Sequence, residues 1–130
     1  GTLRSLRRAL GPGDRRVGVL LYRLAAVHRD RGEYRIAEQM YREALALLRP
    51  VDGAAATPHY GAVLNHLGAL LCEMGQPTAA QEVSQEARLV FAACGRASSW
   101  HYGVAVHNMA VAALQVGRFV QAESLCSSFQ

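Results

Sequence analysis

The chain has 130 residues, of which 51% are hydrophobic and 18% are charged, and its formal net charge is +4. This length corresponds to one ordinary domain, which excludes a multidomain enzyme. The hydrophobic content excludes an intrinsically disordered chain, and no uncharged apolar run approaches the roughly 20 residues that a membrane-spanning helix needs. All 14 basic residues are Arg, and most of them lie in residues 1–50. This bias fits either GC-rich coding or selection for bidentate binding of carboxylates and phosphates.

Apolar residues recur at three-to-four spacing along most of the chain, which predicts helices, and no useful length alternates with the period of two that strands need. A short helix at residues 2–10 is followed by helix pairs at residues 17–50, 58–93 and 99–130, the last cut short inside its second helix. Asp14, Thr57 and Ser98 are predicted to cap the first helix of each pair, because their side-chain oxygens accept hydrogen bonds from free backbone N–H groups.

Three ladders of small residues share one period of 42 or 43 residues. They consist of Gly11, Gly53 and Gly95; Gly32, Gly75 and Gly117; and Ala37, Ala80 and Ala122. The second ladder is predicted to end each first helix in a left-handed turn, where glycine has no Cβ penalty. The alanines are predicted to lie where the two helices of a pair approach closely. Residues 1–130 are therefore predicted to form a single solenoid domain of repeated helix pairs.

The residues of the first unit resemble a tetratricopeptide repeat. The likeness rests on Leu24-Ala25, Gly32-Glu33-Tyr34, Ala37, Tyr41 and Ala44, with Pro50 closing the unit. Residues 7–14 also resemble the Leu-Gly-Pro-Asp connector of the 42-residue variety that occurs in kinesin light chains and many bacterial signalling proteins. The resemblance implies an all-α fold, a right-handed superhelix of antiparallel helix pairs whose first helices line a concave groove. The period alone also admits a HEAT or armadillo array.

The same resemblance implies which residues face the groove. In the kinesin-light-chain variety, asparagines at such positions hold the main chain of a bound peptide, since an Asn amide both donates and accepts hydrogen bonds. Asn65 and Asn108 are thus expected to clamp a peptide backbone, while Arg23 and Arg29 meet an acidic side chain or a C-terminal carboxylate. The candidate peptide-binding residues are Tyr22, Arg23, Arg29, Asn65, His66, His107 and Asn108. The alternative interpretation is a solvated helix face.

We therefore expect a non-catalytic interaction or scaffold module that binds a protein or peptide ligand, acidic in character. No catalytic residue, cofactor or metal is predicted. His66 and His107 come close together if adjacent first helices align, but a metal or acid–base site also needs a third ligand or an orienting carboxylate. No glycine-rich loop follows a strand, so a phosphate cradle is excluded.

Two other functions stay open at this point. One is a regulatory sensor module within a larger signalling protein. The other is binding of nucleic acid or an anionic surface through a cationic cluster near the N-terminus, which is alternatively the solvated outer face of a second helix. That cluster consists of Arg4, Arg7, Arg8, Arg15 and Arg16.

The ends and the cysteines complete the sequence-based expectations. A solenoid needs polar caps, and Leu125 and Phe129 would be left partly uncovered, so we expect either a segment of a longer array or self-association through the ends. Cys72, Cys94 and Cys126 are odd in number and lack disulfide or metal-ligand spacing. With no signal-peptide core at the start, a cytoplasmic, reducing location without membrane insertion is expected.

Overall fold

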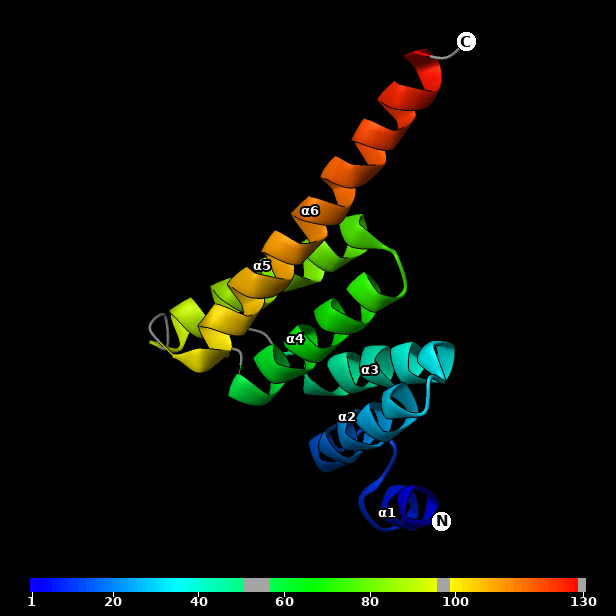
Figure 1. Ribbon diagram of the computed structural model, residues 1–130. Coiled ribbons are helices and arrows are strands. Elements are labelled where there is room, and N and C mark those ends of the chain that lie inside the picture. Colours follow the sequence, from blue (N-terminus) through cyan, green and yellow to red (C-terminus); the bar gives the residue numbers. More distant parts are fainter. Residues whose placement is uncertain (51–56, 96–98, 129–130) are drawn as a thin grey trace.

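A computed structural model describes residues 1–50, 57–95 and 99–128, apart from the side chains of residues 121, 122 and 124–128. The described residues form helices and no strand. The helices are α1 (Thr2–Leu10), α2 (Arg15–Asp30), α3 (Tyr34–Leu48), α4 (Pro58–Glu73), α5 (Pro77–Ala93) and α6 (Trp100–Ser128). Consecutive helices pack against one another as in a helical-repeat superhelix, so the predicted all-α fold is confirmed (Figure 1).

Short polar side chains begin the three first helices. An Asp14 carboxylate oxygen accepts a hydrogen bond from the backbone N–H of Arg16 at 2.8 Å. Thr57 Oγ1 accepts from the N–H of Tyr60 at 3.4 Å. At the start of α6, Ser99 Oγ accepts from the N–H of Tyr102 at 3.3 Å, while the predicted cap Ser98 lies outside the described residues. Each cap satisfies a backbone donor that has no partner within its own helix.

The turns inside the first two pairs are left-handed at glycine, as predicted. Gly32 and Gly75 have φ values of 79° and 72°. The next N–H in each turn then reaches back into the preceding helix: Glu33 donates to the His28 carbonyl and Gln76 donates to the Leu71 carbonyl, both at 2.9 Å. These reversed hydrogen bonds satisfy carbonyls at the helix end, and a residue with a Cβ would be strained at either glycine.

The predicted turn at Gly117 is wrong. α6 is one helix of 29 residues that runs through Gly117, and this glycine is not among the residues with positive φ. Glycine permits a turn without requiring one, and Gly117 is not followed by a proline as Gly75 is by Pro77. A lone glycine inside a helix is unfavourable by only about 1 kcal/mol relative to alanine. Continuation of the helical hydrogen bonds is therefore enough to keep α6 unbroken.

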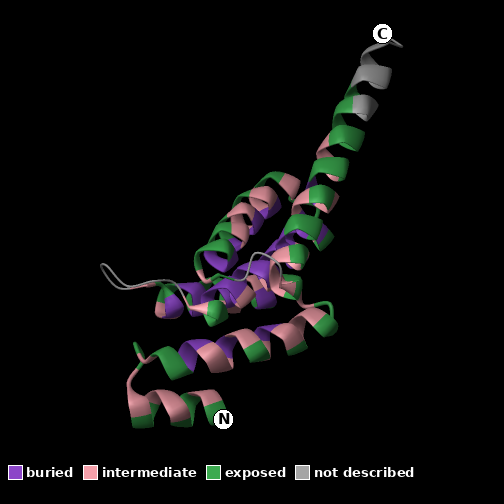
Figure 2. Cartoon of the chain, turned by 90° about the vertical axis from the view of Figure 1, so that its left-hand side faces the viewer, coloured by how far each residue is buried: buried purple, intermediate pink, exposed green. Residues whose placement is uncertain are grey.

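Within each complete pair, small residues allow close packing, as predicted. A Cβ on Gly18 of α2 would lie 3.0 Å from Leu48 of α3, and one on Gly61 of α4 would lie 2.7 Å from the Phe91 ring of α5. Ala37 and Ala80 are fully buried, whereas the side chain of Ala122 lies outside the described residues. Buried residues gather where the helices face one another and form one core that runs from α2 to α6 (Figure 2).

The first helices form the inner row of the stack. α4 contacts both α2 and α6, whereas α3 and α5, the second helices of consecutive pairs, make no contact with each other in the described chain. Because the first helices approach one another and the second helices diverge, the row α2, α4 and α6 lies on the inside of the curve.

Replacement of Ala37 by Leu tests this packing. The added atoms have no room at a fully buried position, so Ala37→Leu is expected to lower the free energy of unfolding by about 1–3 kcal/mol. Urea denaturation followed by circular dichroism measures it. Ala46→Leu is the matched control, because Ala46 lies on the exposed side of the same helix and its change is expected to stay within about 0.5 kcal/mol. Equal stabilities of the two variants would contradict the packing of the pair.

Candidate functional site

Aromatic and imidazole rings from different helices gather on the inner row. The Tyr22 ring of α2 stacks on the His66 ring of α4, with centroids 6.0 Å apart and an angle of 29° between planes. The His66 ring also stacks on the Tyr41 ring of α3, with centroids 6.0 Å apart and an angle of 4° between the planes. His59, two turns before His66, is tilted against Tyr22 at 6.5 Å. These contacts bring the predicted residues Tyr22 and His66 together.

A hollow of about 180 Å³ adjoins this group of rings. It is lined by Arg29, Ala62, Asn65, His66, Ala69, Trp100, His101 and Val104. At its edge Trp100 is 77% exposed, an unusual position for so large an apolar side chain. His101 is stacked on Phe91 with centroids 5.1 Å apart, which holds the imidazole in place beside Trp100. The hollow therefore has a fixed floor and an exposed aromatic rim.

The environment of His66 favours its neutral form. Burial lowers the pKa of His66 below its ordinary value of 6.5, and the nearby charges of Arg29 and His101 act in the same direction. A neutral imidazole stacked between two tyrosines behaves as an aromatic surface with a hydrogen-bonding edge.

Arg29 is already paired within the protein. Its guanidinium makes a bidentate contact with the carboxylate of Glu73 on α4, with Nη2–Oε1 and Nε–Oε2 distances of 2.5 and 3.4 Å. Its side chain is 24% exposed. Glu73 compensates the charge of Arg29, and the expected contact of Arg29 with an acidic ligand stays a prediction. The pair instead joins the first helices α2 and α4.

Asn65 and Asn108 do not point freely into a groove. They are only 6% and 5% exposed. Asn108 Nδ2 donates to the Asn65 carbonyl at 3.0 Å, and Asn65 Nδ2 donates to the His101 carbonyl at 3.0 Å. Their amide donors thus hold α4 and α6 together, and the clamping of a peptide main chain by Asn65 and Asn108 stays a prediction.

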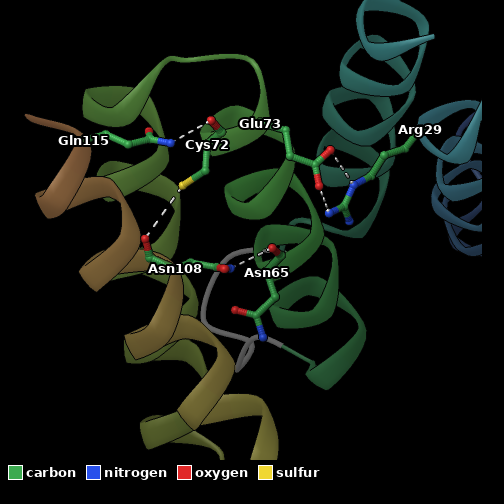
Figure 3. Close-up of polar contacts among 6 residues, drawn as sticks. All are labelled: Arg29, Asn65, Cys72, Glu73, Asn108 and Gln115. Carbon is green, nitrogen blue, oxygen red and sulfur yellow. Dashed lines mark hydrogen bonds and ion pairs between the residues drawn. The ribbon is translucent and has the colours of Figure 1, made fainter. Parts of the chain in front are cut away.

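Two further contacts extend this bracing along the same helices (Figure 3). The Cys72 thiol donates to the Asn108 carbonyl at 3.8 Å, and Gln115 Nε2 donates to the Cys72 carbonyl at 3.0 Å. Burial raises the pKa of Cys72, which disfavours its thiolate form. Two side-chain oxygens of this network, Asn65 Oδ1 and Gln115 Oε1, are buried and have no hydrogen-bond partner among the described residues.

The remaining predicted site residues, Arg23 and His107, are exposed. Arg23 lies on α2 next to Tyr22, and no carboxylate of the described residues pairs with it. His107 is not among the residues that line the hollow with His66. The α6 histidine that lines the hollow with His66 is His101, since residues 101 and 107 lie on different faces of the same helix.

Several residues of the site were not predicted from the sequence, among them His59, Trp100 and His101. His59 and His101 are 42 residues apart, which is one repeat, so the register that aligned the glycines also aligns these two imidazoles. Trp100 has no aromatic counterpart in the other units, and no periodic signal marks it.

Most of the cationic cluster is engaged within the chain. Arg7 pairs with Glu43 at 3.0 Å. Arg15 donates to the Leu48 carbonyl at the end of α3 at 3.0 Å. Arg16 pairs with Asp14 at 3.1 Å, which raises the pKa of Arg16 and lowers the pKa of Asp14. Arg4 and Arg8 of α1 make none of these contacts, and Arg15 and Arg16 are exposed although they are engaged.

The packing defines a class of protein, a solenoid of helix pairs whose first helices form one continuous surface. Residues 19–49, which cover most of α2 and α3, match the family model described as a tetratricopeptide repeat. The chain therefore carries a tetratricopeptide repeat, and repeats of this family generally mediate protein–protein interactions. Among curated proteins, none matches this chain.

The described residues lack two further features. None of the helices there combines the length and apolarity needed to cross a membrane. The same residues contain no group of three or more His, Cys, Asp or Glu side chains arranged to hold a metal ion.

The lowered pKa of His66 predicts a pH dependence of stability. Because the unfolded chain binds this proton at a higher pH than the folded chain, the free energy of unfolding should fall as the pH drops through about 6.5. His66→Phe keeps a flat ring between the tyrosines and is expected to reduce that fall between about pH 7.5 and pH 5.5. Urea titrations at both pH values measure it. His107→Phe is the control, and identical pH dependence in the two variants would contradict the burial of His66.

Proposed function

We propose that this protein is a non-catalytic adaptor that holds an extended segment of a partner protein along its first helices α2, α4 and α6. The observation that carries the proposal is the hollow between α4 and α6, with the exposed indole of Trp100 at its rim. An exposed tryptophan beside a rigid hollow is the arrangement from which binding hot spots are built. The tetratricopeptide repeat at residues 19–49 supports a protein as the ligand.

The size and chemistry of the hollow favour one side chain as its occupant. At about 180 Å³ it is smaller than the roughly 300–1,000 Å³ of sites for small molecules. Its walls combine alanine and valine side chains with the faces of Trp100, His101 and neutral His66. We infer that an apolar or aromatic side chain of the partner enters it.

We infer that Arg23 gives the site its preference for an acidic residue in the ligand. Arg29 is neutralised by Glu73, whereas Arg23 is exposed, lies beside Tyr22 and has no carboxylate partner among the described residues. A carboxylate placed one helix away from the hollow would meet Arg23, and a hydrogen bond to a charged group contributes about 1.5–3 kcal/mol. The proposed ligand therefore carries an apolar anchor followed or preceded by an acidic residue. We place this adaptor in the cytoplasm, where its unbridged Cys72 stays reduced.

Panning a random peptide library against the purified protein, followed by calorimetry on the selected peptides, tests this function. Trp100→Ala is expected to weaken binding by more than about tenfold, because the rim of the hollow is lost. Arg23→Glu is expected to lower the affinity for peptides that carry an acidic residue by about 10- to 100-fold.

The chain offers matched controls for both substitutions. Leu89→Ala removes an exposed apolar side chain from α5, which is outside the inner row, and Arg35→Glu makes the same charge change on α3. Neither control is expected to change the affinity. A library that yields no binder, or peptides bound equally by the wild type and Trp100→Ala, would show that the hollow is not the binding site.

A further inference from the structure

The C-terminal half of α6 leaves the rest of the described chain. The arm, defined as residues 118–128, continues α6 past the other helices (Figure 1). Phe119 and Val120 at its beginning are 64% and 56% exposed. Two neighbouring large apolar side chains in water are unfavourable unless another surface covers them.

The first half of α6 also has an uncovered side. Ala105, Asn108 and Ala112 are buried against the preceding pair. The other side, the open face, consists of Gly103, Val106, Ala110, Ala113, Leu114 and Gly117, all of them outside the buried set. A hollow of about 620 Å³ lies on this face between Ala110 and Arg118.

The repeat shows what covers this face in the other two units. Gly18, Gly61 and Gly103 occupy the same repeat position. A Cβ on Gly18 would meet Leu48 of α3, and one on Gly61 would meet Phe91 of α5, whereas a Cβ on Gly103 would meet nothing within 4 Å. In both complete units, therefore, the second helix of the pair covers the face that is open in α6.

Burial of larger side chains follows the same pattern. Leu21 and Leu64 are each 1% exposed under their second helices, while Val106 at the same repeat position is 43% exposed. By the repeat register the second helix of the third unit is the arm itself, since Ala122 aligns with Ala37 and Ala80. The sequence thus supplies a helix for the open face, but the structure holds that helix away from it.

A continuous α6 cannot cover its own open face. In the second unit Gly68 faces Ser84, and one repeat later these positions are Ala110 and Cys126. Sixteen residues of helix separate the two Cα atoms by about 24 Å. We propose that two copies of this chain exchange their arms, so that each arm covers the open face of the other copy's α6.

The exchange is self-complementary. The two α6 helices run antiparallel about a twofold axis close to Arg118, and each arm makes the contacts that a folded-back arm would make within one chain. Both copies of Arg118 lie near the axis, but this side chain is exposed and solvent screens the repulsion. This inference rests on packing alone and is independent of the proposed peptide site.

A native cysteine allows a direct test. Ala110→Cys is expected to form a disulfide with Cys126 of the second copy under mild oxidation, giving a covalent dimer on a non-reducing gel. The double variant Ala110→Cys, Cys126→Ser is the control and should stay monomeric on the gel. An intrachain disulfide, which gives a compact monomer, or the absence of any bond to Cys126 would overturn the exchange.

A second variant changes the hinge without adding a cross-link. Phe119 aligns with Pro77, so Phe119→Pro reproduces the Gly-X-Pro turn of the second unit. A proline there breaks a continuous helix. The dimerisation affinity measured by sedimentation should therefore be at least about tenfold weaker than that of Phe119→Ala, which loses the same ring. Equal dimer affinity in the two variants, or a wild type that is monomeric at all concentrations, would overturn the proposal.

Discussion

The missing side chain of Gly68 controls how three helices meet. A Cβ at this point of α4 would lie 2.5 Å from Ser84 Oγ of α5 and 3.4 Å from Asn108 Nδ2 of α6. Because Gly68 leaves that space empty, Asn108 comes close enough to α4 to donate to the Asn65 carbonyl. Asn65 in turn holds the His101 carbonyl, and so fixes the start of α6 where Trp100 stands over the hollow. The site thus depends on Gly68 and Asn108, neither of which lines the hollow.

The inner row separates residues that brace the stack from residues that face solvent. Adjacent positions on a helix differ by about 100° in direction, so His107 and Asn108 cannot share one role even though they are neighbours in the sequence. Buried amides and the Arg29–Glu73 pair join the helices, because a buried polar group without a partner is costly. Arg23 and Trp100 remain outside this network, which makes them the side chains that a ligand can contact at no cost to the fold.

The sequence predicted the elements better than the site. Caps at Asp14 and Thr57 and the turns at Gly32 and Gly75 act within a few residues, so their local signals suffice. The site combines α2, α4 and α6 through contacts between residues about one repeat apart, such as Arg29 with Glu73. A family likeness indicates which positions face inward, but it does not say which of those side chains the neighbouring helix has already engaged.

Gly75 and Gly117 show why the third unit differs from the second. Pro77 disfavours helical backbone at the residue before it, so the chain must turn after Gly75. Nothing comparable follows Gly117, and the balance there lies between an unbroken helix and the burial of the arm on the open face. Exchange between copies satisfies both, because the helix stays continuous while the apolar faces are covered. The gain is then shared between two molecules, so the concentration of the protein decides how far the open face is occupied.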